Sequence, residues 1–209
     1  KAARMGVDIR MNTTVTEEMI REIKPHTVIN AIGAEPAIPP IPGVEQEFVA
    51  DSHAVLNGQA VVSGNVVVIG GGLVGMEVAE YLAAKGSTVT VLEMMKEFCA
   101  DMGSTRKICV TENIYAAGIT PVTEVKVTEI KKGAVIGEKD GNVVEFPCDA
   151  AVIAVGARNR DGSALKRACS RIGCGYLEVG DAVKARRAIN ATREAFDAAM
   201  SFDKEEIHA

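Results

Sequence analysis

A glycine-rich segment at residues 70–75 has the residue types and the spacing to bind a phosphate. It reads Gly-Gly-Gly-Leu-Val-Gly and follows residues 66–69, a short β-branched run of the kind that forms a strand buried on both faces. Gly70 permits a tight turn, Gly72 lets a pyrophosphate approach the backbone, and Gly75 lets the next helix lie close to the strand. The predicted cofactor-binding residues of this turn are Gly70, Gly71, Gly72, Leu73, Val74 and Gly75.

An acidic residue, Glu93, lies at the end of the next predicted strand, where dinucleotide-binding folds of this kind carry one. Apolar residues at helical spacing fill residues 74–85, and a second apolar strand at 87–92 ends in Glu93. A carboxylate there can accept hydrogen bonds from a ribose 2′-hydroxyl and would repel a 2′-phosphate. The order strand, glycine turn, helix, strand, acid therefore predicts a Rossmann-like unit that prefers NAD(H). The alternative is a glycine-rich turn that binds nothing.

Composition limits the remaining classes. The chain has 209 residues, is 47% hydrophobic, and is long enough for one large domain or two small ones. A net charge of -5 gives no reason to expect nucleic acid or an anionic membrane as a partner. We find no apolar run of spanning length and no signal peptide. The first residue is Lys1, so we expect a fragment or a processed product.

Five cysteines, with no Cys-x-x-Cys pair, fit a reducing cytoplasm better than a disulfide-stapled secreted domain. No metal-ligand spacing is found among them, so we predict no metal site.

Other segments predict an α/β fold with an insertion. Before the glycine turn we expect helices at 1–5, 16–23 and 51–56, strands at 7–11 and 27–32, and a rigid proline-rich connection at 35–43. After Glu93 we expect helices at 104–117, 163–168 and 188–201 and strands at 150–155 and 176–179. Three strand-like runs at 122–130, 134–138 and 143–146 predict an inserted antiparallel meander. Residues 28–34 and 151–157 are alike, which indicates that the chain leaves one domain near 34 and returns near 157.

The chain resembles the two-dinucleotide-binding-domain flavoproteins, in particular the C-terminal half of the NADH:flavin oxidoreductase, enoate reductase and 2,4-dienoyl-CoA reductase group, which includes trimethylamine dehydrogenase. The resemblance rests on residues 28–43, 70–80, 151–157 and 179–182. It implies a partial FAD-binding domain at 1–55 and 156–209, with the NAD-binding domain at 56–155 inserted between its two parts.

In such proteins, the aspartate of a late Gly-Asp pair binds the ribityl chain of FAD, and here the pair is Gly180-Asp181. A helix-capping aspartate is the plainer alternative. The resemblance places Gly33 near FAD and Gly156 near NAD or the domain junction. Glu77 is either a carboxylate favoured by the helix dipole or a contact near the nicotinamide.

The family's first FAD glycine motif would precede residue 1, as would a barrel with FMN and an iron–sulfur cluster. We therefore expect a module that binds NADH and passes hydride to FAD, for reduction of an activated C=C bond at a site outside this chain. No catalytic residue is assigned, and the chain alone is expected to be inactive. The barrel of the same polypeptide is the expected partner, and homo-oligomerisation is left open. The rival hypothesis is a non-catalytic module that holds ADP or FAD.

Two of the cysteines form a possible redox pair. Cys169 and Cys174 have the spacing of the redox disulfide in glutathione-reductase-like enzymes, but they precede Gly180-Asp181 instead of following a first FAD glycine motif. From this context we expect no redox role for the pair.

Overall fold

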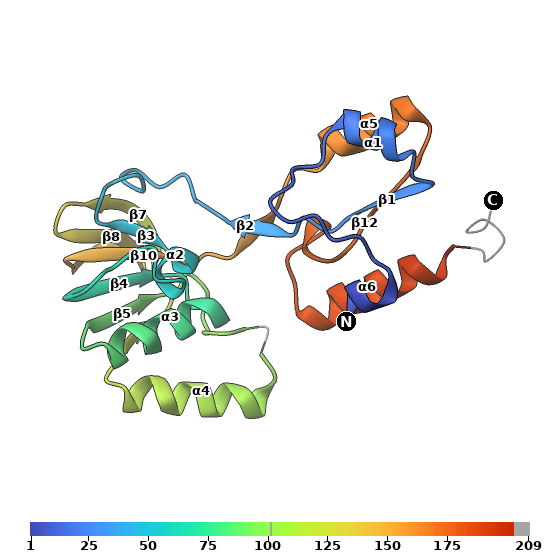
Figure 1. The fold of residues 1–209 in the computed structure, drawn as a ribbon. Helices are drawn as coiled ribbons and strands as arrows, with labels where there is room; N and C mark the ends of the chain where they lie inside the picture. Colours follow the sequence, from blue (N-terminus) through green and yellow to red (C-terminus); the bar gives the residue numbers. More distant parts are fainter. Residues whose placement is uncertain (101, 203–209) are drawn as a thin grey trace. The chain divides into compact units, whose positions relative to one another are not determined.

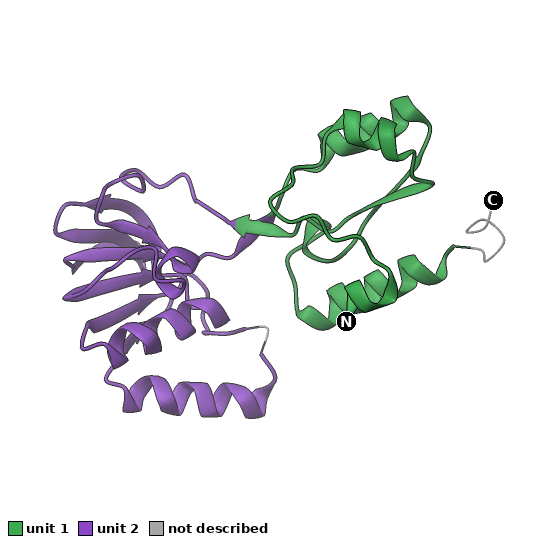
Figure 2. Cartoon of the chain, in the orientation of Figure 1, with its two compact units in different colours: residues 1–35, 159–209 green, residues 36–158 purple. Residues whose placement is uncertain are grey.

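The computed structural model describes residues 1–100 and 102–202, which form two compact units (Figure 2). Unit 2 is the continuous segment Pro36–Arg158. Unit 1 combines Lys1–Glu35 with the chain from Asn159 onward. Strands β2 (Ala34–Pro36) and β11 (Ala157–Asn159) pair with each other where the chain passes from one unit to the other.

Unit 2 is built on a five-stranded parallel sheet of order β3-β10-β4-β5-β6. The strands are β3 (Val49–Asp51), β4 (Asn65–Ile69), β5 (Thr88–Leu92), β6 (Thr120–Val122) and β10 (Ala150–Ile153). Its helices are α2 (Ser52–Leu56), α3 (Leu73–Ala84) and α4 (Ser104–Ala116). The predicted α/β fold with a parallel sheet is confirmed.

Both faces of this sheet are covered, which explains the unbroken apolar run in β4. Val66 and Val68 pack in one cluster with residues of α3, whereas Val67 and Ile69 pack in a second cluster with residues of the meander. Figure 1 shows α3 and α4 on one side of the sheet and the meander on the other. Alternate side chains of a strand point to opposite faces, so a strand buried on both faces needs apolar residues throughout.

The meander consists of β7 (Lys126–Lys131), β8 (Ala134–Lys139) and β9 (Asn142–Pro147), paired antiparallel in sequence order. The predicted three-strand insertion is therefore confirmed, but its first strand was placed too early. Residues 120–122 form β6 of the parallel sheet instead. Glu124, with φ 59°, separates the two strands and redirects the chain.

Unit 1 contains a parallel pair of strands, β1 (Thr27–Asn30) and β12 (Gly175–Glu178). Helices α1 (Glu17–Ile23) and α5 (Ser163–Ile172) pack together on one cluster. The unit also has α6 (Ala188–Met200) and two short 3-10 helices, η1 (Ala2–Met5) and η2 (Gly180–Ala182).

The predicted strand at residues 7–11 is wrong. These residues are not in a strand, and the side chains of Val7, Ile9 and Met11 are exposed. The alternation of apolar and polar residues is real. However, a strand also needs a neighbour to bond with, and none of the described strands pairs with this segment.

The boundaries between the two units lie at 35/36 and 158/159, whereas the predicted domain boundaries are 55/56 and 155/156. Residues 36–55 lie in unit 2, because β3 pairs with β10 through Ala50 and Val152. Among the described helices, none is long and apolar enough to cross a membrane.

Candidate dinucleotide-binding site

The glycine turn connects β4 to α3 in unit 2, and two of its glycines are required by close packing. A Cβ atom on Gly70, whose φ is 110°, would lie 2.5 Å from the carbonyl oxygen of Ala154. A Cβ atom on Gly75 would lie 1.9 Å from the carbonyl oxygen of Gly70. These two positions therefore hold strand, turn and helix together, which agrees with the predicted structural roles.

We expect Gly75→Ala to destabilise the protein, because the added methyl group has no space between α3 and the turn. Overpacking of this kind costs about 1–3 kcal/mol. A urea titration should show a lower unfolding midpoint. An unchanged midpoint would mean that α3 can move away from the turn without cost.

Gly72 differs from its neighbours, because it is exposed and a Cβ atom there would meet nothing within 4 Å. Its φ of -74° and ψ of -176° are accessible to any residue, so the backbone does not require glycine. Gly72 is the N-cap of α3 and offers no side-chain cap. The first amides of a helix lack intrahelical acceptors and attract anions. The open space around Gly72 lies at this end of α3.

Glu93 directly follows β5 and is held in place by two backbone amides. Its Oε2 accepts a hydrogen bond from the Gly71 amide at 2.7 Å, and its Oε1 accepts one from the Met95 amide at 2.7 Å. Gly71 is fixed further, because its carbonyl oxygen accepts a hydrogen bond from the Cys99 amide. Each carboxylate oxygen keeps a lone pair for a ribose hydroxyl, and the side chain is already oriented before any ligand binds.

Glu77 is exposed on the second turn of α3, on the same helix as the open N-terminus. Gly156 is exposed with φ 102°, and its carbonyl oxygen accepts a hydrogen bond from the Ala37 amide. The predicted NAD residues of unit 2 thus comprise one close group at the glycine turn, with Glu77 nearby on α3 and Gly156 after β10.

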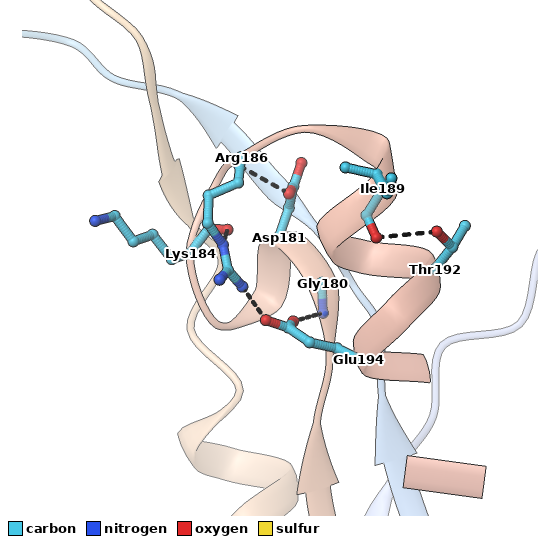
Figure 3. Close-up of polar contacts among 7 residues, drawn as sticks. All are labelled: Gly180, Asp181, Lys184, Arg186, Ile189, Thr192 and Glu194. Carbon is cyan, nitrogen blue, oxygen red and sulfur yellow. Dashed lines mark hydrogen bonds and ion pairs between the residues drawn. The ribbon is translucent and has the colours of Figure 1, made fainter. Parts of the chain in front are cut away.

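Unit 1 carries the predicted flavin-contacting residues. Gly33 has φ 76° and follows β1, while Gly180-Asp181 begin η2 after β12. One oxygen of Asp181 accepts a hydrogen bond from the Arg186 amide at 3.1 Å, and the other has no partner among the residues drawn in Figure 3. That second oxygen is available to a hydroxyl donor.

Glu194 of α6, which no sequence motif marks, organises the same loop. Its carboxylate accepts a hydrogen bond from the Gly180 amide at 2.8 Å and forms an ion pair with Arg186 (Figure 3). The hydrogen bond from Arg186, together with that from Gly180, lowers the pKa of Glu194. Sequence spacing does not indicate this contact, because Gly180 lies 14 residues before Glu194.

No group of metal-binding side chains is found among the described residues.

A parallel sheet with a glycine turn at the N-terminus of α3 and an acid at the end of β5 defines a Rossmann-like dinucleotide-binding protein. The chain belongs to the pyridine nucleotide-disulphide oxidoreductase family, whose family model matches residues 1–184. The family's cofactors, NAD(H) and FAD, are those that the sequence predicted.

Three relatives illustrate the similarity. The chain is 43% identical to bilirubin reductase of Mediterraneibacter gnavus over 154 residues, and this match covers 74% of this chain and 24% of that protein. It is 35% identical over 202 residues to NADH oxidase of Thermoanaerobacter brockii, a match that covers 94% of this chain and 31% of that protein. The solved structure of a 2-naphthoyl-CoA reductase matches with a TM-score of 0.87 at 25% identity, and this match covers 96% of this chain and 30% of that one.

The resemblance to the NADH:flavin oxidoreductase and enoate reductase group is thereby confirmed. The chain spans about a quarter to a third of the length of these relatives.

Proposed function

We propose that this protein is the pyridine-nucleotide module of a flavin-dependent NADH oxidoreductase. In this proposal the amides at residues 72–74 hold the diphosphate, Glu93 binds the adenosine ribose, and Glu77 lies toward the nicotinamide. The observation that carries the proposal is the double anchoring of Glu93 beside an open helix N-terminus. A ready acceptor pair next to an anion site suits an unphosphorylated adenosine ribose.

The chain's own residues bind and orient the cofactors. When bound, NADH supplies a hydride from its nicotinamide to the flavin, which is chemistry of the cofactors themselves. The free oxygen of Asp181 would accept a hydrogen bond from the ribityl chain, in a loop kept in place by Glu194. Gly33 and Gly156 would border the FAD and the NAD, respectively.

We further propose that the whole polypeptide reduces an activated carbon–carbon double bond at a site outside this chain, on an upstream barrel where an iron–sulfur cluster and FMN would supply the electron-transfer chemistry. Support comes from relatives whose names describe reductases, including the 2-naphthoyl-CoA reductase with the same fold.

The experiment that tests this proposal is anaerobic addition of NADH to the intact, flavin-loaded protein. We expect the flavin absorbance to bleach. A flavin that stays oxidised while NADH binds would favour the rival hypothesis of a structural nucleotide-binding module.

Cofactor choice gives a second prediction. We expect NADH to bind at least about tenfold more tightly than NADPH, a difference of ~1.4 kcal/mol, because Glu93 pairs with the ribose diol and repels a 2′-phosphate. Lys96 is the nearest cation along the chain and lies three residues further on. Titration with both nucleotides measures the ratio. In Glu93→Gln the ratio should fall toward one, and equal or tighter binding of NADPH by the parent would refute the assignment.

A further inference from the structure

The end of helix α5 brings two cysteines together. The Gly173 amide donates to the carbonyl oxygen of Cys169 at 2.8 Å, and the Cys174 amide donates to the same oxygen at 3.1 Å. Gly173 has φ 85°, so the helix ends in a left-handed cap. In this type of helix end, the side chain at the position of Cys174 contacts the one at the position of Cys169. Cys174 packs against the buried cluster that contains Cys169.

The two thiols differ in access to solvent. Cys169 is fully buried in the cluster beneath α1 and α5, whereas Cys174 is partly exposed. Burial and the contact with Cys174 raise the pKa of Cys169 to about 11. Cys174 is therefore the sulfur that an external reagent meets first, and Cys169 is a protonated neighbour within reach of it.

Cys174 also lines an open groove with positive charge. The groove is bordered by Arg21 and Lys24 from the end of α1 and by Arg171 from the end of α5. Glu17 pairs with both arginines, which leaves three cationic side chains against one carboxylate. Lys24 is exposed. A reagent that carries carboxylates is attracted to this groove.

We propose that Cys169 and Cys174 form a thiol–disulfide exchange site for anionic low-molecular-weight disulfides. The Cys174 sulfur attacks one sulfur of the small disulfide. That S–S bond breaks, and the first small thiolate leaves and takes up the proton of Cys174. The Cys169 sulfur then attacks the mixed disulfide at Cys174 and releases the second small thiol with the proton of Cys169. Two electrons pass from the protein pair to the small disulfide, and a Cys169–Cys174 disulfide remains.

This site lies wholly within unit 1 and does not depend on the proposed function. A Cys169–Cys174 disulfide would join the end of α5 to the residue before β12, the strand that leads to Gly180-Asp181. The reaction therefore adds a covalent link beside the loop that carries the predicted flavin contact.

Glutathione disulfide is the probe for the test, applied to the intact protein and followed by blocking of free thiols and peptide mapping. We expect a Cys169–Cys174 disulfide in the parent. Cys169→Ser should instead accumulate a glutathione mixed disulfide on Cys174. Cys109→Ser, which removes an exposed cysteine of α4, is the matched control and should form the 169–174 disulfide like the parent.

The role of the positively charged groove is tested by the rates of reaction with an anionic and a cationic disulfide. Lys24→Gln should slow the reaction with glutathione disulfide at least about threefold and leave the reaction with cationic cystamine no slower. Lys132→Gln, an exposed lysine of unit 2, should change neither rate. The proposal is overturned if the parent pair stays reduced in excess glutathione disulfide. It is also overturned if Lys24→Gln slows both reagents equally. Whether the Cys169–Cys174 disulfide forms is measured on the unsubstituted protein, so this result does not depend on the folding of a cysteine variant.

Discussion

Gly72→Val is expected to weaken NADH binding at least ~100-fold, which corresponds to ~2.7 kcal/mol, while leaving the protein folded. The valine side chain would occupy the open space at the N-terminus of α3 where the diphosphate is expected. The backbone at Gly72 is extended with negative φ, and a side chain there meets no protein atom within 4 Å. Loss of binding would therefore come from the ligand site and not from unfolding. Titration with NADH and a thermal melt measure the two effects separately.

Gly103→Val is the matched control for this substitution. Gly103 is also a helix N-cap with negative φ and open surroundings, at the start of α4. It should bind NADH like the parent. If Gly72→Val binds NADH as tightly as the parent, the glycine turn is not the diphosphate site.

The second large effect concerns the 209-residue chain on its own, which we expect to be colourless and unable to oxidise NADH. FAD needs a diphosphate site as well as the ribityl contact of Asp181. Among the described residues, the glycine turn before α3 is assigned to NAD. The remaining contacts must overcome the entropy lost on immobilising a large ligand, and the described residues include no second glycine-rich turn between a strand and a helix to hold the FAD diphosphate.

Absorbance of the purified chain near the flavin bands, together with an NADH oxidation assay using an artificial dye, measures this expectation. A matched measurement is NADH binding, which should persist because the turn and Glu93 are both present. A yellow preparation with stoichiometric FAD that NADH reduces would mean that the FAD-binding residues have been misassigned.

The core of the site was predictable because its signals are local. The apolar strand at 65–69, the glycines that follow and the acid at the end of the next strand lie within 30 residues, and each has its own steric or electrostatic reason. The helix at residues 16–23 was predictable for the same reason, and its N-cap, Thr16, accepts a hydrogen bond from the Met19 amide.

Contacts between distant segments were not predictable. Sequence gave no sign that β3 pairs with β10, because a three-residue strand carries too little pattern. The anchoring of Glu93 by Gly71 depends on where two loops meet in space. The proximity of Cys169 and Cys174 depends on the left-handed cap at Gly173. The position of the pair in the sequence, before Gly180-Asp181, did not indicate it.

The pairing of β1 with β12 also bears on the order of folding during synthesis. Asn30 and its partner Glu178 are 148 residues apart, and the whole of unit 2 is translated between them. At ribosomal rates of about 5–20 residues per second, β1 waits roughly 7–30 s for its partner strand. The last strand of the unit 2 sheet, β10, ends at Ile153, so that sheet is complete only about 1–5 s before Glu178 is made. A nascent chain therefore keeps β1 without its partner strand while the whole sheet of unit 2 is being made, and β1 is where we expect chaperones to bind.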